Sequence, residues 1–77
     1  MADNPLGIVC RLNERHPLVT QLKRRFGFHE VNDLFTLAFE QRLRGVQMMN
    51  SLTTHGQLDR ATLKVLGVHV DGESHGL

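Results

Sequence analysis

The sequence FTLAFEQRLRGVQMM occupies residues 35–49 and has the clearest helical pattern in the chain. Phe35, Phe39 and Leu43 recur every four positions, and Met49 continues the same side. Thr36 is a favourable N-cap, because its hydroxyl accepts a hydrogen bond from a backbone N–H of the first turn. The pattern therefore predicts a helix over 37–49 whose apolar face is buried.

Two shorter helical segments flank this stretch. Pro17 suits the first position of a helix over 17–26, which Gly27 ends. Asp59 is a predicted N-cap for a third helix, which Gly67 ends. The second and third helices each follow a turn and a capping residue, so the chain contains an internal repeat of one turn–helix unit. We expect these units and the leading helix to form an all-α fold, a small three-helix bundle with extended N- and C-terminal arms.

Both ends of the chain lie outside this expected bundle. The apolar, β-branched stretch at residues 5–12 favours extended structure, and the alternation at residues 68–70 favours a short strand that pairs with residues 8–10. We therefore divide the chain into an extended N-terminal arm (1–15), a three-helix domain (16–67) and a C-terminal tail (68–77). Ile8, Val9 and Val70 are the candidate protein-contact residues of the arms.

Length and composition restrict the class of protein. A chain of 77 residues with 40% hydrophobic residues and a formal net charge of +1 suits one small globular domain. Cys10 is the single cysteine, which excludes an internal disulfide and a cysteine-clustered zinc site. No basic and apolar leader opens the sequence, and no apolar run is long enough to suggest a membrane span. We expect synthesis in the cytoplasm without a signal peptide, and no membrane partner.

The order of these motifs resembles the peptidoglycan-binding domain family, the three-helix modules attached to many bacterial and phage cell-wall hydrolases. The resemblance runs from Val19 to Gly67 and has no gap from Asn32 onward. The matching positions are Val19, Leu22 and Phe26, Asn32-Asp33-Leu34-Phe35, Val46-Gln47, Ser51-Leu52, His55-Gly56, Asp59-Arg60-Ala61-Thr62 and Leu66. The chain departs from the family pattern at Asn32-Asp33 (Asp-Gly in the family), Phe39 (Thr) and Lys23 (Gln).

This resemblance implies a non-catalytic attachment module that binds cell-wall peptidoglycan or other protein subunits, including those of a phage virion. The alternative is a purely structural virion, capsid or tail protein that has lost wall binding. Polar residues at helix ends and turns are the candidate ligand-binding groups: Asn32, Asp33, Gln47, Asn50, His55 and Gln57. The same residue types also stabilise turns without binding a ligand.

Catalytic and metal-binding patterns are missing from the sequence. No nucleophile–base pair, pair of carboxylates or His-x-x-x-His spacing is present, so we expect no enzyme, no metal and no cofactor. Cys10 lies in an apolar run, where a buried and inert thiol is the commoner state. His69 and His75 lie in the tail with Asp71 and Glu73, where solvated side chains are expected.

A basic cluster, Lys23-Arg24-Arg25, raises the question of nucleic acid. Its position in the last turn of a helix suits solvated cations that complement the carbonyl end of the helix dipole. The nearly balanced net charge and the apolar character of the third helix disfavour a helix that reads bases. A small DNA-binding protein is therefore the least favoured hypothesis.

Overall fold

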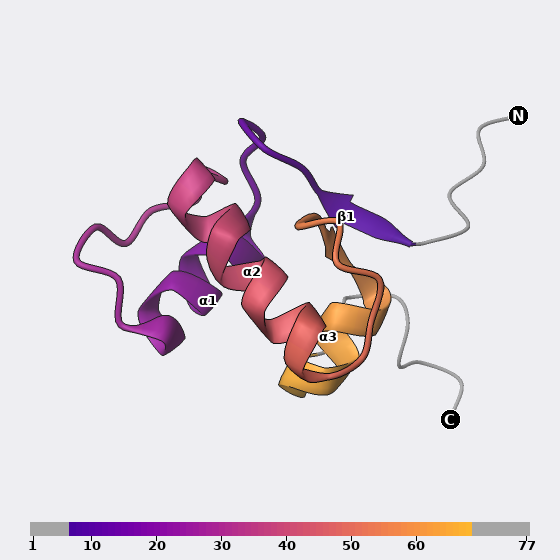
Figure 1. Ribbon diagram of the computed structural model, residues 1–77. Helices are drawn as coiled ribbons and strands as arrows, with labels where there is room; N and C mark the ends of the chain where they lie inside the picture. The colour runs from indigo at the N-terminus through magenta and orange to yellow at the C-terminus, as the bar shows by residue number, and fades with distance from the viewer. Residues whose placement is uncertain (1–6, 69–77) are drawn as a thin grey trace, which may run out of the picture.

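This computed structural model describes residues 7–68 of the chain. They fold into three helices and one short two-stranded sheet (Figure 1). The elements in chain order are β1 (Ile8–Cys10), α1 (Pro17–Phe26), α2 (Leu37–Met49), β2 (Leu58–Asp59) and α3 (Arg60–Leu66). The helices at 17–26, at 37–49 and after Asp59 are those that the sequence predicts.

The predicted all-α class is wrong, because β1 and β2 form an antiparallel pair and the fold is mixed α/β. Ile8 lies opposite Asp59, and Cys10 lies opposite Leu58. Asp59 caps α3 with an extended backbone (φ −119°, ψ 176°), as an N-cap requires. The same extended conformation lets the residues before α3 pair with another strand. Asp59 is therefore both the N-cap of α3 and a residue of β2.

The partner of β1 among the described residues is β2. Residues 8–10, assigned to an arm by the sequence, pair inside the folded body. Val68 lies directly after α3, and its N–H donates to the carbonyl of Leu63 at 2.9 Å. Val70 and the rest of the predicted C-terminal strand and tail lie outside the described residues, as does the start of the N-terminal arm.

The helix ends follow local chemistry. The hydroxyl of Thr36 accepts from the N–H of Phe39 at 3.4 Å, and Gly27 and Gly67 end α1 and α3 in the left-handed conformation (φ 82° and 73°). The N-cap of α1 is His16, whose Nδ1 accepts from the N–H of Leu18 at 3.0 Å. Histidine is not among the usual capping residues, so residue type did not predict this cap.

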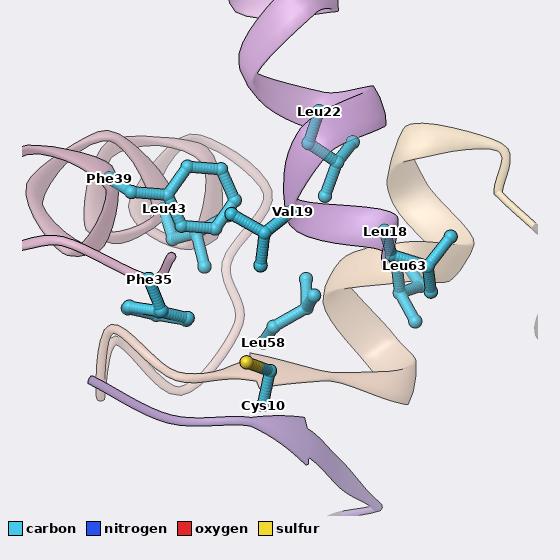
Figure 2. Close-up of a cluster of buried hydrophobic side chains, with 9 residues drawn as sticks. All are labelled: Cys10, Leu18, Val19, Leu22, Phe35, Phe39, Leu43, Leu58 and Leu63. Carbon is cyan, nitrogen blue, oxygen red and sulfur yellow. The ribbon is translucent and has the colours of Figure 1, made fainter. Parts of the chain in front are cut away.

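One hydrophobic core joins all five elements (Figure 2). Side chains converge on it from α1, from α2 and the loop before it, from α3 and from the sheet. Its buried members are Cys10, Leu18, Val19, Leu22, Phe35, Phe39, Leu43, Leu58 and Leu63. The pattern within α2 departs from expectation at one end: Met49 is 86% exposed, whereas Gln47 is fully buried.

A second pairing holds the loop before α2 against the segment before α1. Arg15 and Leu34 form an isolated antiparallel bridge, and the N–H of Phe35 donates to the carbonyl of Glu14 at 2.8 Å. The guanidinium of Arg15 also contacts Asp33 Oδ1 at 2.7 Å. These contacts fix the position of the loop that carries Asn32 and Asp33.

Candidate functional site

The six predicted ligand-binding residues lie at opposite ends of α2. Asn32 and Asp33 are in the loop before its N-terminus, whereas Gln47, Asn50 and the residues at 55–57 lie at its C-terminal end or in the loop that follows. A helix of this length spans about 20 Å, since each residue adds about 1.5 Å. The structure therefore brings these residues into two separate groups.

Gln47 holds the loop before β2 in place. Its Nε2 donates to the carbonyl of Gln57 at 2.8 Å and to Thr62 Oγ1 at 2.9 Å. Its Oε1 accepts from the N–H of Gly56 at 2.9 Å. Both amide hydrogens are used, and the side chain has no exposed surface. Gln47 is therefore a structural residue that ties α2 to the loop and to α3.

Gly56 allows this loop to approach α2 closely. Its φ of 81° lies in the left-handed region, and an added Cβ would come within 2.7 Å of Glu40 Cγ. Arg44 fastens the same loop, because its Nη1 donates to the carbonyl of Thr54 at 3.0 Å. A residue without a side chain is required here by both the backbone angle and the contact.

His55 is held through both ring nitrogens. Its Nδ1 accepts from the N–H of Gln57 at 2.9 Å, and its Nε2 lies 2.8 Å from Asp59 Oδ2. A backbone N–H only donates, so the neutral ring carries its proton on Nε2 and donates it to Asp59. This leaves neither nitrogen to bind a metal or to remove a proton from a substrate.

Asp59 completes this buried network. Its Oδ1 accepts from both the N–H and the hydroxyl of Thr62. Burial alone would raise the pKa of Asp59, but the hydrogen bonds from Thr62 and His55 outweigh it and hold the pKa below the ordinary aspartate value. The hydroxyl of Thr62 bonds to the carboxylate and not to the imidazole, so these three residues form no nucleophile–base pair.

This network makes the stability depend on pH. A carboxyl with a lowered pKa in the folded state contributes stability above the ordinary aspartate pKa of about 4. That contribution is lost as the pH falls through the lower pKa of the folded chain. Urea midpoints measured from neutral pH downward are therefore expected to fall in acid, and Asp59→Asn is expected to remove part of that fall.

The matched control for this measurement is Glu30→Gln, because Glu30 is an exposed carboxylate without a hydrogen bond among the described residues. This variant is expected to follow the pH profile of the unmodified chain. An unchanged acid loss in Asp59→Asn would contradict the role given to Asp59.

Asn32 and Asn50 keep spare hydrogen-bonding capacity at the surface. Asn32 Oδ1 accepts from Lys23 Nζ at 2.8 Å and from the N–H of Leu34 at 3.1 Å, while its Nδ2 has no partner among the described residues. Asn50 Nδ2 donates to the carbonyl of Val46 at 2.8 Å, and its Oδ1 likewise has no partner there. Both residues are exposed, so each offers one amide atom to a ligand.

The other two candidates contribute less. Asp33 is bound to Arg15, in an ion pair in which both side chains are largely accessible to solvent. Gln57 takes part in the network through its backbone N–H and carbonyl, and no hydrogen bond to its side chain is present among the described residues. Its side chain is half-buried.

Lys23 is a buried cation that the sequence analysis placed in a solvated basic cluster. It is only 2% exposed, and its Nζ lies 6.0 Å from the centre of the Phe28 ring in addition to its bond to Asn32. The spacing from Val19 to Lys23 to Phe26 follows the buried face of α1 and is the signal that would have revealed this position. Lys23 holds the loop after α1 against the helix.

Cys10 and the described histidines form no reactive or metal-binding group. Burial, followed by the charge of Glu14, raises the pKa of the Cys10 thiol to about 11, so the thiol is protonated near neutral pH. Within residues 7–68, no three His, Cys, Asp or Glu side chains are placed to hold a metal ion together. His69 and His75 lie outside the described residues.

The proposed protein-contact residues Ile8 and Val9 lie in β1 and are half-buried, and Val9 packs against the core. Larger exposed apolar side chains occur on α2, at Leu37, Met48 and Met49. None of the helices described between residues 7 and 68 has the length and apolar character needed to cross a membrane.

Comparisons with known proteins identify no relative: no family model, no curated protein and no solved structure matches this chain.

Proposed function

We propose that this chain is a non-catalytic attachment module. One observation carries the proposal: the side chains of the types that perform chemistry are used to hold the fold together. The Gln47 side chain is hydrogen-bonded to the loop before β2, and the His55 ring is hydrogen-bonded to Asp59. Cys10 is buried, and the pKa of its thiol is raised. Of the candidate ligand-binding residues, Asn32 and Asn50 have amide atoms without a partner among the described residues, which suit binding and not bond cleavage.

The proposed ligand is cell-wall peptidoglycan. The resemblance of the motifs between Val19 and Gly67 to peptidoglycan-binding domains favours it, and the positions of Asn32 and Asn50 are compatible with it. These two amides lie beyond opposite ends of α2, whose 13 residues span about 20 Å. Contacts at that separation suit a polymer with repeating amide and hydroxyl groups better than a small molecule.

Retention on purified, insoluble murein tests the proposal. The full chain is expected to sediment with murein, and Asn32→Ala combined with Asn50→Ala is expected to reduce the retained fraction several-fold. Gln41→Ala is the matched control, because Gln41 is an exposed amide in the middle of α2 without a hydrogen bond among the described residues. A chain that stays in the supernatant, or a control that loses as much retention as the double variant, overturns wall binding.

The second candidate is a structural subunit of a protein assembly, such as a virion, without wall binding. Met48 and Met49 favour it, because they are adjacent at the C-terminal end of α2 and are 68% and 86% exposed. Exposed apolar side chains that lie together mark protein contacts more often than scattered ones do. No retention on murein, together with self-association in sedimentation that Met48→Gln and Met49→Gln abolish, supports this candidate.

A further inference from the structure

The net charge of +1 hides an uneven distribution of charge along the chain. All nine Lys and Arg residues lie within residues 7–68, whereas Asp3, Asp71 and Glu73 lie outside that range. The acidic residues inside the range are Glu14, Glu30, Asp33, Glu40 and Asp59. Residues 7–68 therefore carry a clear positive excess, and a near-neutral total is not an argument against an anionic partner.

Most of these carboxylates are also engaged within the described part of the chain. Four of them have partners: Asp33 with Arg15, Glu40 with Arg44, Asp59 with His55 and Thr62, and Glu14 with the N–H of Arg11. Glu30 is the one without such a partner between residues 7 and 68. These four carboxylates are therefore not available to pair with the other Lys and Arg side chains.

Four exposed cations lie on three helix segments that two hydrogen bonds join. Arg24 and Arg25 lie in the last turn of α1, Lys64 lies in the last turn of α3, and Arg42 lies on α2. Two hydrogen bonds join these elements: Arg42 Nη2 donates to the carbonyl of Phe26 at 3.1 Å, and Arg25 Nη1 donates to the carbonyl of Leu66. We call Arg24, Arg25, Arg42 and Lys64 the cationic end.

The side chains of the cationic end have no ion pair with a carboxylate among the described residues. Arg42 also stacks over the Phe26 ring at 5.2 Å, so its guanidinium is held in one place. A guanidinium has five N–H donors, and Arg25 and Arg42 each use one of them on a helix carbonyl. The bonds that position these two side chains therefore leave most of their donors for a ligand.

We propose that the cationic end binds the phosphate backbone of a nucleic acid without reading its sequence. Arginine matches phosphate oxygens with two parallel hydrogen bonds, and three of the four cations are arginines. Base readout would need several polar side chains that project from one helix. The seven residues of α3 include the apolar residues Leu63, Val65 and Leu66, so contacts to phosphates and not to bases fit this surface.

Fluorescence anisotropy with a labelled DNA duplex of about 20 base pairs tests the proposal, because binding by phosphate contacts weakens steeply with salt. We expect binding at low salt, with log Kobs falling against log salt at a slope between about −3 and −4 for four phosphate contacts. An unlabelled duplex of unrelated sequence is expected to compete equally well.

The variant Arg24→Gln with Lys64→Gln is the sharpest test, since neither side chain has a hydrogen bond among the described residues. It is expected to reduce the salt slope by about 2, one unit for each lost phosphate contact. Arg15→Gln is the matched control: Arg15 is an exposed arginine outside the cationic end that is paired with Asp33. It is expected to keep the salt slope and affinity of the unmodified chain.

Three results overturn the proposal. The first is no binding at low salt, and the second is equal loss of binding in Arg15→Gln and in the double variant. The third is competition by polyglutamate as effective as that by duplex, which would assign the cationic end to acidic proteins. Thermal melting of each variant shows that the fold is kept, so that a loss of binding reports the surface itself.

Discussion

Replacing Phe39 with alanine is expected to leave the chain unfolded at room temperature. Phe39 has no exposed surface, and its ring centre lies 5.0 Å from that of Phe35, 6.0 Å from that of Phe26 and 6.1 Å from that of Phe28. Removing a buried phenylalanine costs about 3–5 kcal/mol of unfolding free energy. Domains of this size rarely gain more than about 3–5 kcal/mol from one core, so the loss consumes most or all of the stability.

Circular dichroism during urea and thermal unfolding measures this effect. Phe39→Leu keeps most of the buried volume and is expected to remain folded with a lower midpoint. Leu37→Ala removes an exposed apolar side chain from the same helix and is expected to change the unfolding free energy by no more than about 0.5 kcal/mol. A cooperative transition in Phe39→Ala near the midpoint of the unmodified chain would contradict this account of the core.

The Phe39 ring joins Phe26, Phe28 and Phe35 in one aromatic group. The helical spacing of Phe35 and Phe39 was sufficient to predict that both are buried.

The helices could be predicted because their signals are local. Pro17, Thr36 and Asp59 start the three helices, and Gly27 and Gly67 end two of them through left-handed backbone angles. Each signal involves residues within about one turn of the helix end, so no knowledge of the tertiary fold is required. This is why the predicted boundaries agree with the structure.

The β2 strand and its pairing with β1 could not be predicted, for the opposite reason. β2 has two residues, and its pairing with β1 joins segments that are far apart in the sequence. Leu58 and Asp59 satisfy the local pattern of a helix start, and nothing in that pattern shows that their extended backbone has a partner. An N-cap and a strand end require the same backbone conformation, so only the tertiary contact distinguishes a cap that pairs from one that does not.

The sequence did not separate the candidate residues by their structural roles. Asn32 and Asn50 are exposed, whereas Gln47 and His55 hold the buried network together. Residue type alone does not distinguish a polar group that awaits a ligand from one that satisfies the backbone of a neighbouring loop. For Gln47 the distinction was present in the spacing, because it follows Phe39 and Leu43 at intervals of four on the buried face of α2.

That burial makes Gln47→Leu the second substitution with a large expected effect. Leucine fills a similar volume, but it leaves the buried N–H of Gly56 and the carbonyl of Gln57 without a partner and removes the bond to Thr62. Each buried polar group that loses its partner costs about 1–3 kcal/mol. We therefore expect a loss of about 3 kcal/mol of unfolding free energy, close to the stability available to a chain of this size.

Gln41→Leu is the matched control, because it makes the same chemical change at an exposed position of the same helix. It is expected to shift the unfolding free energy by no more than about 0.5 kcal/mol. Urea unfolding followed by circular dichroism compares the two variants, and amide hydrogen exchange at Gly56 reports the lost bond directly. Equal midpoints for Gln47→Leu and Gln41→Leu would show that the network contributes no stability. Gln47 would then need another reason to be buried, and a ligand-binding role for the loop at residues 55–57 would become the better explanation.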